Sequence, residues 1–328
     1  MQSNLSAPTL AIGELLWDLI PTGARLGGAS TNFAVLTARL GNFSALISCI
    51  GDDPLGHQAA LRLAALADTP DAKGHLDLAG IQISRTLPTG TVAVSFDCNH
   101  RPQYEIVSPV AWDAILVPPQ ALELSRHAAV ICFGTLAQRE EVSRDSIRAL
   151  IQAAGPECIR VCDLNLRAPF VSAEVVCWCL QHADVLKISD EELPEVARLV
   201  GQPSLAEGIA SPVDDEALTA AATKTAQALL EFAPQCRLVA ITLGPHGSLL
   251  ADRSGIHRHR GFVIRVADTV GAGDAFTAGL VHAYLRGASL AQISEVSNLC
   301  GSHVASHPGA TPELPPALLG AIAEALQS

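Results

Sequence analysis

Short apolar runs alternate with amphipathic stretches along most of this chain, and this alternation constrains the fold more than any other feature. The runs are apolar almost throughout, as is usual for strands buried on both faces. The stretches between them carry apolar residues at helical spacing, for example Phe33, Leu36 and Leu40 before a stop at Gly41. Repeated strand–helix–strand units predict a mostly parallel sheet with helices on both faces. The predicted strands are TLAIGELLWDLI (9–20), SALISCIG (44–51), AAVICFG (128–134), CIRVCDLN (158–165), ADVLKIS (183–189) and CRLVAITLG (236–244).

The composition limits the size and the material of the core. The chain has 328 residues, 49% of them apolar and 4% aromatic, so the core must be built from Ala, Leu, Val and Ile. This length allows one large domain or two ordinary ones. The segments 68–77 and 201–216 are typical of loops, but neither is long enough to separate two domains. We therefore expect a single domain over residues 1–328.

The charge and the cysteines narrow the class of protein. A net charge of −12 and an isoelectric point of about 5.3 argue against a nucleic-acid partner. The start shows no signal-peptide pattern, and no uncharged apolar run reaches the roughly eighteen residues of a membrane span, so we expect no membrane partner. The nine cysteines lack the spacing of zinc ligands. Free thiols in a reducing cytoplasm are therefore expected.

One region, 89–108, departs from the buried-strand pattern. Its sequence, TGTVAVSFDCNHRPQYEIVS, alternates apolar and polar residues on both sides of a polar turn. Such alternation predicts a half-exposed hairpin rather than a strand of the parallel sheet. The hairpin could be a flap over a binding site, or an edge hairpin without a function.

A glycine-rich turn near the C-terminus predicts an anion site. FVIRVAD (262–268) is strand-like, Gly271-Ala272-Gly273 permits a tight turn, and the residues after it follow helical spacing. The first N–H groups of a helix lack internal partners and carry the positive end of its dipole, so they attract anions. The turn is neither a Rossmann fingerprint nor a P-loop, because the spacing and the lysine of those motifs are missing.

Asp274 places a carboxylate beside this anion site, where a second negative charge should repel the first. One interpretation is a simple helix cap, since aspartate is common there. The other is phosphoryl transfer: the turn holds the moving phosphoryl group while Asp274 takes the proton from the attacking hydroxyl. From these residues alone, both interpretations remain open.

Two groups of residues far apart in the chain form signatures. One is DTVGAGDAF (268–276); the other is GGASTNFA (27–34) followed by LG (40–41) and IGDDPLG (50–56). Together they resemble the signatures of the PfkB (ribokinase-like) carbohydrate kinases, although Ser30 stands where proline is usual. The resemblance covers nearly the whole chain. It implies a three-layer α/β/α sandwich with a mostly parallel central sheet and a small β lid formed roughly by 13–27 and 89–108, and it favours Asp274 as the catalytic base with Gly271, Ala272 and Gly273 as the anion hole.

The resemblance also implies a sugar site. It assigns sugar contacts to Asp18, Gly28 and Asn32, whose carboxylate and amide groups suit a ligand rich in hydroxyls. CDLNLR is similar to the family's D-x-N-x-R, so Asn165 and Arg167 are expected near the substrate, with Arg167 on a phosphate or an acidic group. A structural salt bridge is the alternative for Arg167. Arg101 in the lid could pair with a carboxylate of an acidic sugar or lie in a solvated turn.

ATP and metal ions are implied by three further segments. KISDEE resembles K-x-N-x-x-E, with Ser189 in place of asparagine; Lys187 and Ser189 would contact ATP, and Glu192 would hold Mg²⁺ through water. ITLGPHGS is similar to the nucleotide loop T-L-G-x-x-G. The resemblance places Thr242, Gly244, Gly247 and Asn298 at ATP, and Asp268 and Gly309 at a possible monovalent cation site that would take K⁺.

The sequence constrains the identity of the sugar less than it constrains the type of reaction. GELLWDLIP and KISDEE are most similar to fructokinases, so we expect a fructokinase that converts fructose to fructose 6-phosphate. The alternatives are a 2-keto-3-deoxygluconate kinase, a ribokinase or nucleoside kinase, and a non-catalytic sugar-binding relative. Segment 68–79 is longer than the usual link of the family. A homodimer through the lid is also expected.

Overall fold

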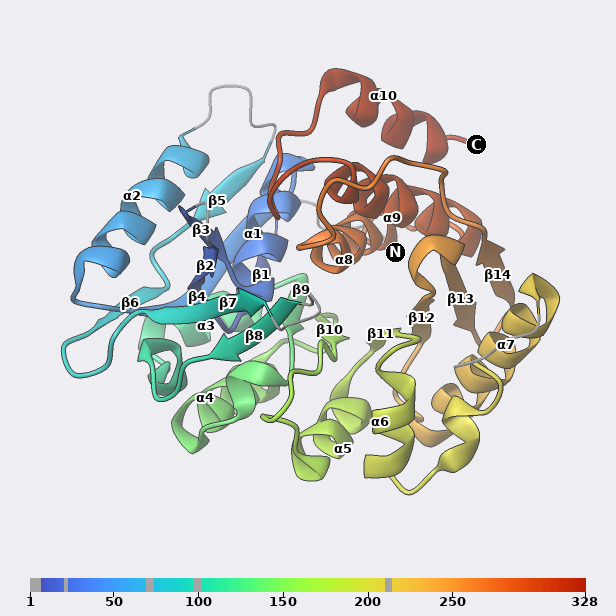
Figure 1. Ribbon diagram of the computed structural model, residues 1–328, viewed down its shortest axis with the longest axis horizontal. Helices are drawn as coiled ribbons and strands as arrows, with labels where there is room; N and C mark the ends of the chain where they lie inside the picture. Colours follow the sequence, from blue (N-terminus) through green and yellow to red (C-terminus); the bar gives the residue numbers. More distant parts are fainter. Residues whose placement is uncertain (1–6, 21–22, 69–73, 97–101, 210–213) are drawn as a thin grey trace.

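Figure 1 shows the computed structural model of the chain, which describes residues 7–20, 23–68, 74–96, 102–209 and 214–328. A ten-stranded sheet runs through it in the order β14-β13-β12-β11-β10-β9-β1-β4-β5, and β6 also pairs with β4. Neighbours are parallel except at one edge, where β13 is antiparallel to both β12 and β14. The strands are β1 (Thr9–Ile12), β4 (Phe43–Gly51), β5 (His75–Asp77), β6 (Ile81–Ser84), β9 (Val130–Phe133), β10 (Ile159–Asp163), β11 (Val185–Ser189), β12 (Leu238–Thr242), β13 (Ser248–Asp252) and β14 (Ile256–His259).

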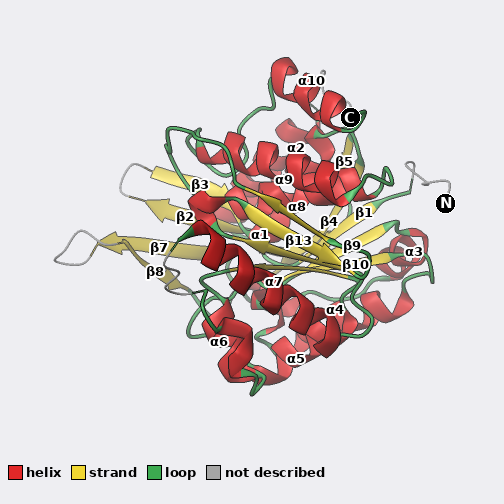
Figure 2. Cartoon of the chain, turned by 90° about the vertical axis from the view of Figure 1, so that its right-hand side faces the viewer, coloured by secondary structure: helices red, strands yellow, loops and turns green. Residues whose placement is uncertain are grey.

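Helices cover both faces of this sheet, and Figure 2 shows the resulting three layers edge-on. Each face of the sheet packs on its own cluster of buried aliphatic side chains. One layer contains α1 (Ala29–Arg39), α2 (Pro54–Ala67), α8 (Ala272–Tyr284), α9 (Leu290–Ala305) and α10 (Pro316–Ala325). The other contains α3 (Pro119–His127), α4 (Glu141–Ala153), α5 (Ala173–His182), α6 (Leu193–Leu199) and α7 (Asp215–Phe232). The predicted α/β/α sandwich with a mostly parallel sheet is confirmed.

A second sheet of four strands projects beyond the sandwich, and we call it the small sheet (Figure 2). It consists of β2 (Leu16–Ile20), β3 (Gly23–Gly27), β7 (Gly90–Phe96) and β8 (Pro102–Ile106), in the order β3-β2-β7-β8. The hairpin predicted over 89–108 is present as antiparallel β7 and β8. The alternation in its sequence fits a strand pair outside the buried layers.

Two contacts fix the small sheet where β7 begins and where β8 ends. Before β7, the carboxylate of Asp53 accepts hydrogen bonds from the backbone N–H of Thr89 at 2.7 Å and from its hydroxyl at 2.8 Å. After β8, Arg139 donates to the carbonyl of Val107 at 2.8 Å while its guanidinium pairs with Asp113 at 2.7 Å. Both contacts hold the base of the hairpin, not its tip.

Two expectations for strands were wrong. The run 9–20 is not one strand, because the chain turns at Gly13, which has a φ of +149°, and then enters the small sheet as β2. Segment 262–268 is not a strand; the N–H groups of Ala267 and Asp268 both donate to the carbonyl of Ala305 instead of to a neighbouring strand. The apolar residues of this segment suggested a buried strand, but Val263 and Val266 are exposed.

The two predicted loops are also partly ordered. Segment 68–77 ends in the short strand β5, while residues 69–73 lie outside the described residues. Segment 201–216 contains the 3₁₀ turn Pro203–Ala206 and the start of α7, whose first turn is capped by the side chain of Asp214. All eight described cysteines are free, and seven are buried. In the described parts of the chain, no helix is both long and apolar enough to cross a membrane.

Candidate active site

The predicted site residues gather at the carboxyl ends of the parallel strands. β1, β10, β11 and β12 end directly before Gly13, Leu164, Asp190 and Leu243, respectively, and the signature residues follow these ends. In open parallel sheets the loops at this edge form the ligand-binding crevice. The start of α8 lies at the same edge, since a cavity there is lined by Asp274 together with residues that follow β1, β9 and β10.

The start of α1 is fastened to the turn after β1. The hydroxyl of Ser30 donates to the carbonyl of Ile12 at 3.1 Å, and that of Thr31 to the carbonyl of Glu14 at 3.1 Å. Gly28 has a φ of +100°, and a Cβ there would lie 2.4 Å from the carbonyl oxygen of Glu14. Only glycine fits such a contact. Ser30, which departs from the usual proline, therefore has a structural role of its own.

The glycine turn before α8 needs glycine for two reasons. Gly271 caps the helix in the left-handed region with a φ of +79°, and a Cβ at this position would lie 2.6–2.7 Å from atoms of Ala310. Among the described residues no side chain caps the helix. The N–H of Ala272 donates to the carbonyl of Thr269 at 3.2 Å, so the groups left for an anion are the N–H groups of Gly273 and Asp274. The difference from the prediction is what precedes the turn, which is an extended loop and not a strand.

Asp274 lies in the first turn of α8 and contacts the start of α1. Its Oδ2 accepts a hydrogen bond of 2.8 Å from Nδ2 of Asn32. Burial, followed by the nearby charge of Asp163, raises the pKa of Asp274 from 3.8 to about 7, and the bond from Asn32 works in the opposite direction. A carboxylate with a pKa near neutrality can accept a proton at physiological pH, which is the property that a general base needs.

A buried ion pair lies beneath the glycine turn. Nζ of Lys187 is 3.0 Å from Oδ1 of Asp163, and Oδ2 of Asp163 accepts a bond of 2.9 Å from the hydroxyl of Thr277 on α8. A Cβ on Gly273 would be 3.1 Å from Nζ of Lys187, so the ammonium group lies directly against the turn. Burial disfavours the charge of Lys187, but the charges of Asp163 and Glu192 outweigh it and raise its pKa. Lys187 therefore supplies a permanent positive charge at the anion site.

Asp18 reaches the site from the small sheet. It lies on β2 opposite Arg25 of β3, and its carboxylate covers Gly27, where a Cβ would be 2.4 Å from Oδ2. Burial and the charge of Asp268 raise the pKa of Asp18 to about 6, while Arg167 and Arg25 oppose the rise. At neutral pH the group is mostly ionised and can accept hydrogen bonds from sugar hydroxyls.

Asn165 and Arg167 follow β10 on the side facing Asp274. Asn165 lines the same cavity as Asp274 and has a φ of +44°, a left-handed conformation that asparagine tolerates. Among the described residues, Arg167 forms no ion pair, and the one hydrogen bond of its side chain goes to the carbonyl of Leu166 at 3.0 Å. Its charge lowers the pKa of both Asp18 and Asp274. The guanidinium is therefore available to a ligand between these two carboxylates.

The nucleotide loop predicted at 242–247 leaves β12 at Thr242 and forms the 3₁₀ turn η4 (Gly244–His246). Gly244 and Gly247 both have positive φ, +53° and +86°. A Cβ on Gly247 would lie 2.2 Å from the backbone N–H nitrogen of Gly261, so the loop packs closely on the chain that leaves β14. Gly247 is therefore required by this close approach, and Gly244 suits its left-handed conformation. The N–H groups of Leu243, His246 and Gly247 donate to carbonyls of the loop itself at 2.8–3.1 Å, and Pro245 has no N–H, so among the described residues of this turn the N–H of Gly244 is the donor left for a phosphate.

Ser189 and Glu192 bind each other. The carboxylate of Glu192 accepts bonds of 2.8 Å from both the N–H and the hydroxyl of Ser189, and one of 2.5 Å from the N–H of Leu166. No cluster of three or more His, Cys, Asp or Glu side chains suitable for direct metal binding occurs among the described residues. The three hydrogen bonds fix the Glu192 carboxylate and use one lone pair of Oε1, so its other lone pair could accept a hydrogen bond from a water of a magnesium ion. The hydroxyl of Ser189 donates to Glu192 and so helps to orient its carboxylate.

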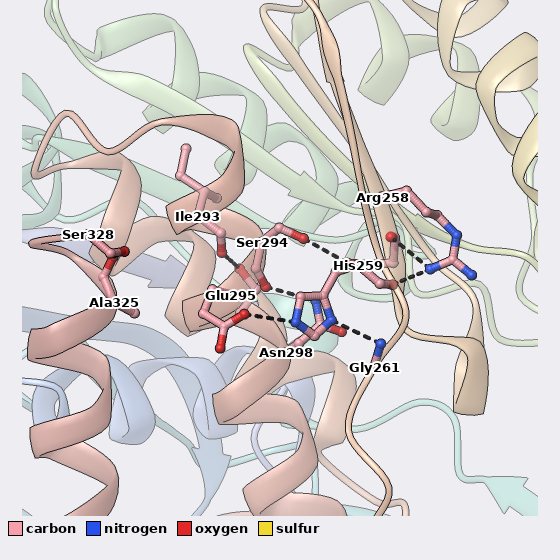
Figure 3. A network of polar contacts seen from close by, with 11 residues as sticks. Arg258, His259, Gly261, Ile293, Ser294, Glu295, Asn298, Ala325 and Ser328 are labelled. Carbon is pink, nitrogen blue, oxygen red and sulfur yellow. Dashed lines mark hydrogen bonds and ion pairs between the residues drawn. The ribbon is translucent and has the colours of Figure 1, made fainter.

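Asn298 belongs to α9 and lies within the polar network of Figure 3. Its Nδ2 donates to the hydroxyl of Ser248 at 2.7 Å and to the carbonyl of Ser294 at 2.7 Å. Both amide hydrogens are used within the protein, and the residue is only 6% exposed. Asn298 therefore fastens α9 to the central sheet, and only its Oδ1 is left for a nucleotide.

The predicted monovalent cation site does not fit the residues present. Asp268 Oδ2 pairs with Arg25 at 2.9 Å and accepts the N–H of Gly309 at 3.2 Å, while Oδ1 accepts the N–H of Val270 at 3.1 Å. The carboxylate is thus already neutralised and surrounded by donors. Gly309 presents an N–H to it, which repels a cation. The remaining predicted residue, Arg101, lies outside the described residues.

Sequence reasoning missed two residues of the site. Glu14 is 4% exposed, lines the cavity beside Asp274, and its Oε1 accepts the N–H of Ala29 at 3.2 Å. Burial raises its pKa. Thr277 fixes Asp163 from α8. The signal for Glu14 was a single acid inside an apolar run; the signal for Thr277 was its place one helical turn after Gly273.

The sequence of residues 22–317 matches the family described as pfkB family carbohydrate kinase. This match spans most of the chain, so the protein belongs to that family and is an ATP-dependent sugar kinase. The chain is 28% identical to fructokinase-2 of Solanum lycopersicum, covering 96% of this chain and 95% of the relative. It is 27% identical to probable fructokinase-2 of Arabidopsis thaliana, covering 93% and 92%.

Solved structures agree with this assignment. Fructokinase from Vibrio cholerae O395, in a form with fructose, ADP and calcium ion bound, has a TM-score of 0.74 at 25% identity, covering 97% of this chain and 99% of that one. An uncharacterized sugar kinase from Pyrococcus horikoshii has a TM-score of 0.78 at 25% identity, covering 98% and 100%. The ribokinase-like fold is therefore shared over nearly the full length.

The raised pKa of Asp274 predicts a cost in stability. The folded pKa, about 7, lies above the unfolded value of 3.8, so ionisation destabilises the fold progressively as pH rises between these values. Asp274→Asn cannot ionise but can still accept from Asn32. We expect this variant to gain roughly 1–4 kcal/mol over the wild type at pH 8 and clearly less at pH 5, after allowance for solvent screening.

Urea unfolding at both pH values measures this difference. The matched control is Asp145→Asn, because the side chain of Asp145 is exposed on α4 and makes no hydrogen bond or ion pair with the residues that the structure describes. Its stability should follow that of the wild type at both pH values. An Asp274→Asn gain that is equal at pH 5 and pH 8 would contradict the raised pKa.

Proposed function

We propose that this kinase transfers the γ-phosphoryl group of ATP to the C6 hydroxyl of fructose, with Asp274 as the general base. The observation that carries the proposal is the contact between Asn32 and Asp274 beside the glycine turn. It joins a sugar-binding side chain, a base of suitable pKa and an anion site in one place. Each of these features alone has an ordinary structural explanation; together they form the parts that phosphoryl transfer requires.

The reaction follows from this arrangement. Asn32 holds one oxygen of Asp274, so the other oxygen faces the incoming hydroxyl. Asp274 takes the hydroxyl proton as the sugar oxygen forms its bond to the γ-phosphorus. The bond between that phosphorus and the oxygen bridging it to the β-phosphorus breaks, and ADP leaves with that electron pair. The N–H groups of Gly273 and Asp274 and the charge of Lys187 stabilise the phosphoryl oxygens during the transfer.

ATP would lie across the carboxyl ends of β11 and β12. The backbone of the loop from Thr242 to Gly247 would follow the phosphates, and Lys187 would approach the transferred group. Mg²⁺, held by Glu192 through water, would neutralise charge on the phosphates. The hydrogen bonds from Ser189 and from the N–H of Leu166 hold the Glu192 carboxylate in a fixed orientation for this contact.

The small sheet would serve as the lid. It carries Asp18 into the site. Asp53 and Arg139 hold its base against the sandwich, and its strands would cover the sugar. A closed lid excludes water, which would otherwise accept the phosphoryl group. A homodimer through this sheet stays a prediction.

Fructose is the first choice because the aligned relatives named above are fructokinases and one similar solved enzyme has fructose bound. Other sugars remain candidates: a solved aminoimidazole riboside kinase from Salmonella enterica shares the fold at 22% identity and a TM-score of 0.73. Arg167, free of an ion pair, could also bind the carboxylate of 2-keto-3-deoxygluconate. These are alternatives of substrate and not of reaction class.

A substrate panel tests the choice of sugar. ADP release should depend on added sugar, and fructose should give the highest kcat/KM among ketoses, pentoses, keto-acids and nucleosides. A higher value for another sugar would replace fructose in the proposal. No stimulation by any sugar would refute a catalytic role.

Replacement of the base tests the mechanism. Asp274→Ala should lose kcat by about two to three orders of magnitude or more, because both proton removal and positioning are lost. Sugar binding, measured by calorimetry, should persist. Asp145→Ala serves as the matched control and should keep its full kcat. Turnover of Asp274→Ala within about tenfold of the wild type would contradict the assignment.

The pH profile gives a separate test of the same group. Activity requires ionised Asp274, so kcat/KM should rise with pH to a plateau, with a midpoint near the free-enzyme pKa of about 7. Protonation of Asp18 should steepen the fall of kcat/KM near pH 6. Asn32→Ala removes a bond that favours the charged base, so its kcat/KM midpoint should move to higher pH. A flat profile from pH 5 to pH 8 would exclude a carboxylate base of this pKa.

A further inference from the structure

One ion pair connects the small sheet to the catalytic turn. Nη1 of Arg25, on β3, lies 2.9 Å from Oδ2 of Asp268, the first residue of the signature that contains the base. The two residues are 243 positions apart in the chain. The pair is partly exposed, with 45% of the Arg25 side chain and 20% of the Asp268 side chain accessible, so it adds little to the stability of the fold. Its location suggests a role in the site instead.

The surroundings of Asp268 are occupied by donors. Besides Arg25, the carboxylate accepts the backbone N–H groups of Val270 and Gly309. The nearby carbonyl of Ala305, a group that could otherwise bind a cation, accepts the N–H groups of Ala267 and Asp268. A monovalent cation at this carboxylate would have to displace the guanidinium and would gain no free carbonyl from Ala305.

Arg25 also balances a second carboxylate. It is the cross-strand partner of Asp18, and its charge lowers the pKa of Asp18 while Asp268 raises it. Two acids, one for the sugar and one at the catalytic turn, therefore share this guanidinium. Without it they would repel each other across the junction between the small sheet and the body.

We propose that Arg25 is a positioning residue that takes the place of a monovalent cation at Asp268 and ties the small sheet to the catalytic turn. The guanidinium neutralises Asp268 and holds the turn so that the N–H groups of Gly273 and Asp274 face the phosphoryl group. Because β3 carries the guanidinium, the position of the small sheet determines the charge at Asp268. This inference rests on the proposed phosphoryl-transfer site.

Potassium and Arg25→Gln test the proposal together. Activity is measured with the best sugar of the panel, at constant ionic strength set with tetramethylammonium chloride, with and without about 100 mM K⁺. The wild type should change by less than about twofold, because its cation is built in. Arg25→Gln should lose about fivefold or more in kcat without K⁺, with a smaller change in the KM for ATP.

Rescue separates a lost charge from a damaged fold. K⁺, or guanidinium at about 20 mM, should restore most of the kcat of Arg25→Gln, since either can neutralise Asp268. Arg25→Lys, which keeps the charge, should lose less kcat than Arg25→Gln. Arg62→Gln is the matched control, because the side chain of Arg62 is exposed on α2 and makes no ion pair or hydrogen bond within the described part of the chain. This variant should resemble the wild type with and without added cation.

Three results would overturn the proposal: strong activation of the wild type by K⁺, an unchanged kcat in Arg25→Gln without K⁺, or a lowered kcat that neither cation restores. Because the substrate is whichever sugar the panel selects, an error in the choice of fructose leaves this test intact. An inactive wild type on every sugar would count against the proposed function instead.

Discussion

The hydrogen bond of 2.8 Å between Asn32 and Asp274 joins residues 242 positions apart, and the geometry of the site depends on it. It can form only if α1 and α8 begin side by side. α1 begins where it does because Ser30 and Thr31 bond to the turn after β1. α8 begins where it does because Gly271 packs without a side chain against Ala310. The two signatures of the sequence therefore both contribute to one contact, because each sets the start of one of the two helices that meet there.

The carboxyl group of Asp274 can lie beside an anion site because it does not have to be ionised at neutral pH. Burial and Asp163 favour the protonated form of Asp274, while the bond from Asn32 limits this effect, and the resulting pKa of about 7 allows both forms near neutral pH. The permanent positive charge comes from Lys187, whose ion pair with Asp163 keeps it ionised although it is buried. The turn therefore combines a permanent positive charge, from Lys187, with a carboxyl group that no longer repels an anion when it is protonated.

Most of the residues that the structure brings together at this site could be predicted from the sequence, because they lie in short motifs with fixed geometry. The predictions were weakest where long-range packing decides. Glu14 looked like part of a strand, since nothing local shows that Gly13 ends β1. Asn298 had the right place in the chain for a nucleotide contact, but Ser248 and Ser294 use both of its amide hydrogens. Asp268 matched a cation ligand, and only the fold brings Arg25 to it.

The reaction and the choice of sugar have different physical origins in this molecule. The groups proposed to move the proton and the phosphoryl group lie at strand ends and helix starts of the sandwich, where buried ion pairs and glycine packing leave little freedom. The small sheet contributes Asp18 and is attached by Asp53, Arg139 and the ion pair of Arg25. Its strands pack outside the sandwich, so their sequence can change without disturbing the catalytic groups. The motifs therefore constrain the proposed phosphoryl-transfer groups and the proposed sugar contacts of Gly28 and Asn32, while Asp18 lies in the small sheet at a position outside both signatures.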